Sequence, residues 1–236
     1  MSLPDFSVYI PHIAFDSVVF GFSKGKLKIL LMEYHATGWF ALPGGFVERN
    51  ENLEDAVKRG LFERTGLQDV YLEQFHTFGS VERFKPEVMK TIFEANNHPI
   101  EWDHWLLDRF LSIGYYALID HEKVTLQPDA ISDSIAWYDI EQLPELIFDH
   151  SIIVQKALQT LRENLDRKLI GGNLLSDRFT MNEFQAVYEA ILGEKLRRTS
   201  FQRKMLSMDF LERHEKLFTG KSHKAPYLYS FKSNKP

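Results

Sequence analysis

The feature that most constrains the fold of this chain is a glycine-rich turn followed by one amphipathic helix. The run Leu42-Pro43-Gly44-Gly45 has the composition of a tight turn. The apolar residues that follow recur four apart, which places them on one face of a helix over residues 53–65: Leu53, Val57 and Leu61. Gly66 comes next, where glycine commonly ends a helix. The chain therefore holds a helix with one buried face that follows this turn-forming run.

Segments rich in branched and aromatic residues surround this helix and predict strands of one sheet. They cover residues 13–22, 27–34, 70–78, 111–119 and 135–140. The composition of residues 23–26 predicts a hairpin turn between the first two strands. Strands combined with this helix predict an α/β fold.

The pattern becomes helical after residue 143. Residues 151–168 predict one helix with Ile153, Ala157 and Leu161 in register, and Gly171-Gly172-Asn173 then breaks the chain. We therefore divide the chain into an N-terminal domain (residues 1–150), a linker helix (151–170) and a C-terminal domain (171–236).

The net charge also differs between the C-terminal domain and the rest of the chain. Residues 171–236 hold 12 Lys and Arg against 7 Asp and Glu, a net charge of +5, whereas the first 170 residues carry −10. A basic C-terminal part indicates either a polyanionic partner or simply a solvated basic helix face.

Two helix starts follow each other in the basic part. Thr180 with Glu183, and Thr199 with Gln202, have the spacing of capping boxes. The apolar spacing extends the two helices to about residues 192 and 208, and in the second helix it predicts three inward-facing residues: Phe201, Met205 and Leu206. Two short helices with a six-residue link predict a helix-turn-helix.

A basic loop between two strand-like segments, residues 210–213 and 225–231, predicts a two-stranded wing. In a winged helix-turn-helix that binds DNA, the second helix enters the major groove. We expect base contacts from three residues: Ser200, Gln202 and Arg203. Phosphate contacts are expected from five others: Arg197, Arg198, Lys204, Lys221 and Lys224. A winged helix used only for protein contact is the alternative.

Residues 45–67 resemble the Nudix box, G-x5-E-x7-R-E-U-x-E-E-x-G-U, in which U is a bulky aliphatic residue. Seven positions match at the family's spacing: Gly45, Glu51, Arg59, Leu61, Glu63, Gly66 and Leu67. With the surrounding strands the resemblance covers about residues 8–148. It implies an α/β/α sandwich with a mixed sheet.

Two positions depart from that pattern, because Gly60 and Arg64 stand where active Nudix enzymes carry Glu. Residues 60, 63 and 64 share one helix face, and in the enzymes this face holds Mg²⁺ through carboxylates. Here its formal charge is zero instead of −3, and Arg64 stays protonated. We therefore expect no catalytic residue, metal or cofactor. Glu51, Arg59 and Glu63 are then remnants of the Nudix box without a catalytic role, and Glu63 is expected to form an ion pair with Arg59.

A domain that has lost its catalysis keeps its cleft, so we expect the N-terminal domain to bind a small molecule. Four candidate ligand-binding residues follow from position: Phe40, Phe46, Arg83 and Tyr115. Core packing is the alternative for the aromatic residues, and a surface ion pair for Arg83. The insertion over residues 84–108, with Trp102 and Trp105, is a candidate lid. Its segment 98–105 indicates a surface helix more than a metal cluster.

The order of Nudix domain, linker helix and basic winged helix resembles the Nudix-related transcription regulators. Four further segments have the same resemblance: residues 143–150, Phe179-Thr180, Tyr188-Glu189 and residues 200–204. The family includes repressors of NAD metabolism that respond to ADP-ribose, and sugar regulators of Bacteroidetes. The chain is most similar to the arabinose-responsive branch of these regulators. The resemblance implies a homodimer on a palindromic double-stranded DNA operator. The insertion over residues 84–108 departs from the family's compact loop.

We therefore expect a DNA-binding transcription regulator that binds a sugar or an ADP-ribose-like effector without hydrolysing it. The alternative is an Mg²⁺-dependent Nudix hydrolase of a nucleoside diphosphate derivative such as ADP-ribose, with a carboxylate supplied from elsewhere: Glu82, Glu87 or Glu101. A third hypothesis is a protein-interaction module.

The composition also argues against proteins that depend on cysteine chemistry and against secreted or membrane proteins. The chain has no cysteine, so disulfides, thiolate metal sites and a thiol nucleophile are excluded. We see neither a signal peptide nor an apolar run of membrane-spanning length, and expect a cytoplasmic protein without membrane contact.

Overall fold

The computed structural model describes residues 6–68, 70–166, 173–218 and 225–232. The N-terminal elements are β1 (Tyr9–Ser23), β2 (Lys26–Tyr34), β3 (Phe40–Ala41), β4 (Gly44–Glu48), α1 (Leu53–Thr65), β5 (Tyr71–Phe78), α2 (Pro86–Ala95), β6 (Leu111–Leu118) and β7 (Ser132–Asp139). They are followed by α3 (His150–Asn164), β8 (Phe179–Thr180), α4 (Met181–Leu192), α5 (Arg198–Ser207), β9 (Leu211–Lys216) and β10 (Tyr227–Phe231).

Within the described residues, the N-terminal strands form one seven-stranded mixed sheet. The order along its main path is β3-β2-β1-β6-β5, with β4 paired to β1 and β7 to β2. β1 runs parallel to β6, and the other pairs are antiparallel. The predicted hairpin between β1 and β2 is confirmed. Its two loop residues, Lys24 and Gly25, both have positive φ, as a tight two-residue turn with the twist of the strands requires.

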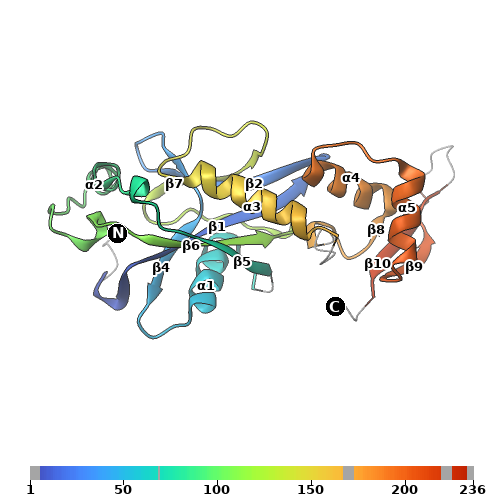
Figure 1. Ribbon diagram of the computed structural model, residues 1–236, viewed down its shortest axis with the longest axis horizontal. Helices are drawn as coiled ribbons and strands as arrows, with labels where there is room; N and C mark the ends of the chain where they lie inside the picture. The colour runs from blue at the N-terminus through green and yellow to red at the C-terminus, as the bar shows by residue number, and fades with distance from the viewer. Residues whose placement is uncertain (1–5, 69, 167–172, 219–224, 233–236) are drawn as a thin grey trace.

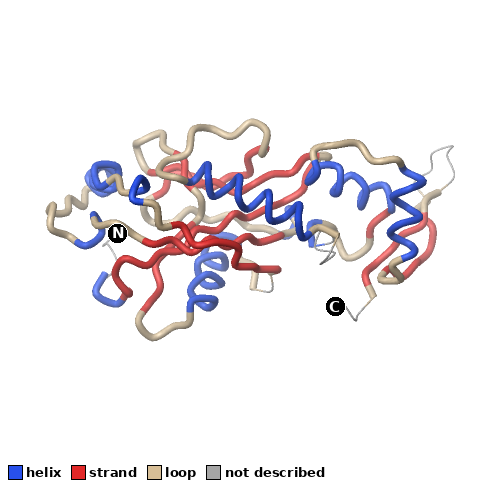
Figure 2. The backbone as a smooth tube through the Cα atoms, in the orientation of Figure 1, coloured by secondary structure: helices blue, strands red, loops and turns tan. Residues whose placement is uncertain are grey.

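Helices cover both faces of this sheet, as Figures 1 and 2 show. On one face, Val57 and Leu61 of α1 pack with Val19 of β1. On the other, Ile153 and Leu161 of α3 pack with neighbouring strand residues. Side chains alternate across a strand, so one sheet supplies two apolar layers. The expected α/β/α sandwich is therefore present.

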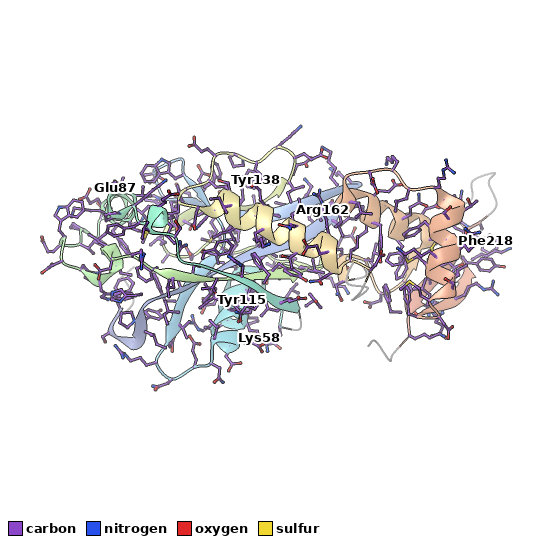
Figure 3. All side chains as sticks on the ribbon, viewed as in Figure 1. Lys58, Glu87, Tyr115, Tyr138, Arg162 and Phe218 are labelled. Carbon is purple, nitrogen blue, oxygen red and sulfur yellow. The ribbon has the colours of Figure 1, made fainter. Side chains whose placement is uncertain are left out.

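α3 joins the sandwich to the C-terminal domain. The apolar cluster beneath α3 continues without a break into residues of α4, including Phe184 and Tyr188. Arg162 of α3, labelled in Figure 3, donates from Nε to the carbonyl oxygen of Ile191 at 2.7 Å. The two domains therefore share one apolar core at this end of α3.

The C-terminal domain is a helix-turn-helix with a small sheet. α4 begins with the predicted capping box of Thr180 and Glu183 and ends before Gly193. The second predicted capping box is wrong: Arg197 is the N-cap of α5, without a side-chain cap bond, so Thr199 lies inside the helix. Leu206 is exposed, not buried. The wing sheet has three described strands, because β8 pairs with β10 and extends the predicted hairpin.

Two expected helices differ in extent. α3 begins one residue before the predicted start and is helical to Asn164, and residues 167–170 of the predicted linker lie outside the described part. Residues 98–105 are not a surface helix. They form an irregular segment that leads into a single 3₁₀ turn, Trp105–Leu107. No helix of the described residues is both long and apolar enough to span a membrane.

Candidate functional site

A cavity of about 350 Å³ opens beside the sheet, against the second half of α1. β1 and β4, the α1 residues that face the sheet, and the residues just before α3 form its walls. The insertion forms the remaining wall through residues such as Phe84, Met89 and Phe93. This volume lies within the range of sites that hold small molecules.

Arg64 forms part of the cavity floor and is nearly buried. Its guanidinium donates to four acceptors. NH2 binds Asp129 Oδ2 at 2.8 Å and the carbonyl oxygen of Gly44 at 3.0 Å. NH1 binds the carbonyl oxygen of Gly60 at 3.0 Å, and Nε binds Met32 Sδ at 3.2 Å. A planar fork held on three sides cannot turn away, so Arg64 is a rigid cation of the floor.

Gly60 makes room for this arrangement. A Cβ atom at position 60 would lie 3.0 Å from Cζ of Phe15 and 3.4 Å from NH1 of Arg64. Glycine in a helix interior costs about 1 kcal/mol relative to alanine. The close approach of Phe15 explains why glycine stands here, and a larger side chain would have to displace the aromatic ring.

The remaining acidic positions of the box are bound to Arg59. Glu51 accepts hydrogen bonds from Arg59 Nε at 3.1 Å and NH2 at 2.7 Å, and from the backbone N–H of Glu48. The Arg59 hydrogen bonds hold the pKa of the Glu51 carboxyl below its ordinary value. Glu63 lies 3.6 Å from Arg59 NH1, which is the predicted pair. Glu51 is nevertheless the closer partner, a contact that the helix periodicity does not indicate.

These residues do not fit a divalent cation. Mg²⁺ requires oxygen ligands in near-octahedral geometry, whereas the face of α1 presents a glycine, a paired glutamate and a guanidinium. Within the described ranges, no group of three or more His, Asp or Glu side chains has the arrangement of a metal site. The three carboxylates considered as replacements, Glu82, Glu87 and Glu101, do not line the cavity.

Arg83 lines the cavity but is held in a buried ion-pair network. Its Nε and NH2 donate to the two carboxylate oxygens of Asp149 at 3.1 and 3.2 Å. NH1 donates to the carbonyl oxygen of Phe110 at 2.9 Å, and NH2 lies 3.6 Å from Asp16 Oδ2. The alternative of a surface ion pair is therefore wrong, since the Arg83 side chain is only 9% exposed.

His150, the first residue of α3, completes this network. Its Nδ1 accepts a hydrogen bond from the backbone N–H of Leu42 at 3.0 Å, so Nε2 carries the proton of the neutral ring. Nε2 lies 3.5 Å from Asp16 Oδ1. Burial lowers the pKa of His150. The start of α3 is thus attached both to the segment between β3 and β4 and to the cavity.

The structure separates the four residues considered for ligand binding. Phe46 and Arg83 line the cavity, whereas Phe40 and Tyr115 do not. Phe40 packs edge-on against Tyr138, with ring centroids 5.5 Å apart. Tyr115 is buried on the α1 face of the sheet (Figure 3), where core residues cover its ring. For these two aromatic residues, core packing is the correct interpretation.

The insertion acts as a wall of the cavity, and its tryptophans are not the residues that line it. Trp102 is exposed, with Lys90 Nζ 5.0 Å from its ring centre. Trp105 packs behind Phe46, with ring centroids 5.7 Å apart. Sequence reasoning missed the apolar residues of α2, although their helical spacing was visible. It also missed Asp129, which no local pattern marks, and it indicated Asp149 only as a candidate N-cap of the following helix, not as the partner of Arg83.

The second helix of the helix-turn-helix presents a basic face. Five of the six described candidates for DNA contact are exposed, and the sixth is half-buried: Arg197, Arg198, Ser200, Arg203 and Lys204, then Gln202. Lys204 Nζ bonds to Asp166 at 2.6 Å. The other two candidates, Lys221 and Lys224, lie outside the described residues.

Glu189, near the end of α4, binds residues of the turn between α4 and α5. Its carboxylate accepts from Gln185, from Lys195 and from the backbone N–H of Leu196, at 2.8 to 2.9 Å. Hydrogen bonds led by that of Lys195 lower the pKa of Glu189 to about 2. The carboxylate therefore stays charged at physiological pH and keeps its capacity to accept these bonds.

Comparison with known proteins gives the class of each part. Residues 10–159 match the NUDIX domain family, and residues 171–231 match the NrtR DNA-binding winged helix domain. A curated relative from Acinetobacter baylyi, an ADPR responsive transcriptional repressor, is 31% identical over 86% of this chain and 75% of its own length. An ADP-ribose pyrophosphatase from Methanocaldococcus jannaschii is 28% identical over 66% of this chain and 79% of its own.

A solved structure has the same two-domain arrangement. Shewanella oneidensis NrtR superposes with a TM-score of 0.72, 28% identity and 95% coverage of both chains. The same protein bound to a 27mer DNA gives the same TM-score over 93% of each chain. The fold and the site thus define a Nudix domain joined to a DNA-binding winged helix. The chain belongs to the NrtR-type transcription regulators.

Proposed function

We propose that this protein regulates transcription by binding a small effector in its Nudix domain without hydrolysing it, and by binding an operator as a homodimer. The observation that carries the proposal is the position of Arg64. A fixed guanidinium occupies the floor of the cavity where the Nudix box of an enzyme presents carboxylates for Mg²⁺. Loss of the metal ligands removes the chemistry and leaves the cavity.

The charges around the cavity favour an effector with an anionic group. Lys85 and Arg109 both line it and are exposed, and neither makes an ion pair with a described residue. The wall behind them is aromatic and apolar, with Phe84, Phe93 and Phe110. ADP-ribose combines a pyrophosphate with a stacking base and is the effector of the Acinetobacter relative. A neutral sugar lacks the anionic group and is the second candidate.

One experiment tests the effector half of this proposal. ADP-ribose is titrated into the protein by calorimetry, once with Mg²⁺ and once with a chelator, and the mixtures are assayed for AMP. We expect the same affinity in both buffers and no AMP. Turnover at ordinary enzyme rates that depends on Mg²⁺ and is lost in Glu63→Gln would favour the hydrolase. Arabinose and other pentoses are titrated in parallel and would take the place of ADP-ribose if they alone bind.

The DNA half leads to a prediction for Arg203. Arg203 is exposed on α5, and an arginine that binds a guanine edge contributes about 1–3 kcal/mol of discrimination. Arg203→Ala is therefore expected to weaken binding to the protein's own upstream region about 5- to 150-fold, and binding to unrelated DNA much less. Mobility shifts at two salt concentrations measure both affinities.

The control for Arg203 is Lys58→Ala, which removes one positive charge from an exposed position on α1. It should leave both affinities as they are in the unsubstituted protein. Equal weakening on specific and unrelated DNA would make Arg203 a phosphate contact. No retardation of any upstream fragment at low salt would contradict a regulator. Sedimentation of the protein with an operator fragment tests the homodimer, since a palindromic site requires two copies.

A further inference from the structure

Three consecutive residues connect the cavity to the linker helix. Phe148 and His150 both line the cavity, and Asp149 between them is the N-cap residue of α3. No other described segment both lines the cavity and begins the helix that reaches the winged helix domain. This segment therefore contacts the cavity and belongs to the connection between the two domains.

The Asp149 carboxylate can bind either Arg83 or the first turn of α3, but not both at once. Aspartate is a preferred N-cap residue, because its carboxylate can accept from a first-turn N–H group that has no backbone acceptor. In α3 the N–H groups of His150 and Ile152 already donate to the carbonyl oxygens of Ile147 and Asp149, which leaves that of Ser151 for the carboxylate. Here it makes no such bond and is bound through both oxygens to Arg83. The first turn of α3 thus lacks the side-chain cap that its own sequence supplies.

Arg83 can exchange Asp149 for a ligand. Its three hydrogen bonds within 3.5 Å go to Asp149 and to the carbonyl oxygen of Phe110, which leaves two of its five N–H groups without such a bond. The side chain also lines the cavity, so an anionic group bound there meets the same guanidinium. Asp16, 3.6 Å away, keeps Arg83 compensated when Asp149 leaves.

The backbone at this point is also strained. Phe148 has a φ of 53°, in the left-handed region that aromatic residues rarely adopt. Strain of this kind persists only where surrounding contacts impose it, and it occurs at switch regions. The Arg83–Asp149 pair, one residue further on, is such a contact.

The far end of α3 is bound to the winged helix domain. Besides the bond from Arg162 to Ile191, the Tyr188 hydroxyl donates to the carbonyl oxygen of Leu165 at 3.3 Å, just after α3. Figure 1 shows α3 extending from the α2 side of the sheet to α4. The helix that begins at the cavity is thus bound at its other end to the helix-turn-helix.

We propose that Asp149 switches between Arg83 and the first turn of α3, and that an anionic group of the bound effector drives this switch by binding Arg83. This inference rests on the proposed function, since it specifies how the cavity regulates DNA binding. A ligand shifts such an equilibrium only by its different affinity for the two states, and here the difference is its bond to Arg83.

Asp149→Asn tests the switch in the full chain. Asparagine caps helices as well as aspartate but binds a guanidinium more weakly, so the variant favours the capped state. Hydrogen exchange at residue 151 is expected to slow about fivefold, the effect of one cap bond. Affinity for the upstream DNA is expected to change about tenfold, in the direction that ADP-ribose produces in the unsubstituted protein.

Asp133→Asn is the matched control, because Asp133 lies on β7 outside the cavity lining and bonds to His35. Arg83→Gln, which frees Asp149 by removing its partner, should reproduce the slowed exchange and add nothing to Asp149→Asn. Unchanged exchange at residue 151, or DNA affinity equal to that of the control, would overturn the switch. Absence of any DNA binding would instead contradict the proposed function, while the exchange measurement would still decide the switch.

Discussion

Replacing Arg64 with Glu, the residue that active Nudix enzymes carry at this position, is expected to lower the free energy of unfolding by about 3 kcal/mol or more. The guanidinium compensates Asp129 and satisfies the carbonyl oxygens of Gly44 and Gly60. A carboxylate in the same place would face one carboxylate and two carbonyl oxygens. Restoring the enzyme's residue therefore damages the fold instead of rebuilding a metal site.

Denaturant unfolding measures this loss, with and without millimolar Mg²⁺. Lys58→Glu is the matched control, since it reverses the same charge on the same helix at an exposed position, and we expect a change of only about 0.5 kcal/mol. Mg²⁺ should not rescue the Arg64→Glu variant, because position 60 still offers no carboxylate and Phe15 fills the space beside it. Full stability in the presence of Mg²⁺ would contradict our account of the cavity floor.

Replacing Phe184 with Ala is expected to lower the free energy of unfolding by about 3–5 kcal/mol. Phe184 is fully buried in α4, and its ring lies within 5.1 to 5.7 Å of those of Phe179, Tyr188, Phe201 and Phe231. Through Phe201 it supports α5. The variant should therefore also lose affinity for DNA, although position 184 makes no contact with DNA itself.

Calorimetric or denaturant unfolding together with mobility shifts measures both effects. Phe62→Ala on α1 removes the same ring from a half-exposed position and should change stability by about 0.5 kcal/mol or less. If Phe184→Ala bound the upstream DNA normally, the aromatic cluster would not be what positions α5. Since the cluster is continuous with the apolar core beneath α3, the destabilisation should also be detected in the N-terminal domain.

Elements with a strong local signal were predicted closely from the sequence. The limits of α1 follow from its four-residue apolar spacing and from Gly66, and those of α4 from its capping box and Gly193. The start of α5 was misplaced by two residues, because Thr199 and Gln202 have the spacing of a cap without forming one. The spacing of a capping box permits the side-chain cap bond, but it does not determine at which residue the helix begins.

In the candidate site, the sequence predicted only those features that follow from the chemical nature of single residues at known positions of the Nudix box or next to a strand. The consequence of Gly60 and Arg64 followed from charge and helix geometry, and Arg83 was placed correctly at the cavity. Its partners were not predicted, because Asp149 lies 66 residues away and Asp129 lies 65 residues from Arg64. Phe40 and Tyr115 were assigned to the cavity on position alone, and the sheet turns both into the core.

The sequence by itself determined the helices with regular apolar spacing, the two-domain order, the basic character of α5 and the replacement of two carboxylates on α1. Each of these depends on residues within a few turns of one another, where spacing and charge act directly. Only the tertiary structure decided what surrounds Arg64, which residues line the cavity, and that Asp149 is bound to Arg83 instead of capping α3. These contacts join distant segments, and they form only because the packed sheet and α3 bring the two partners together.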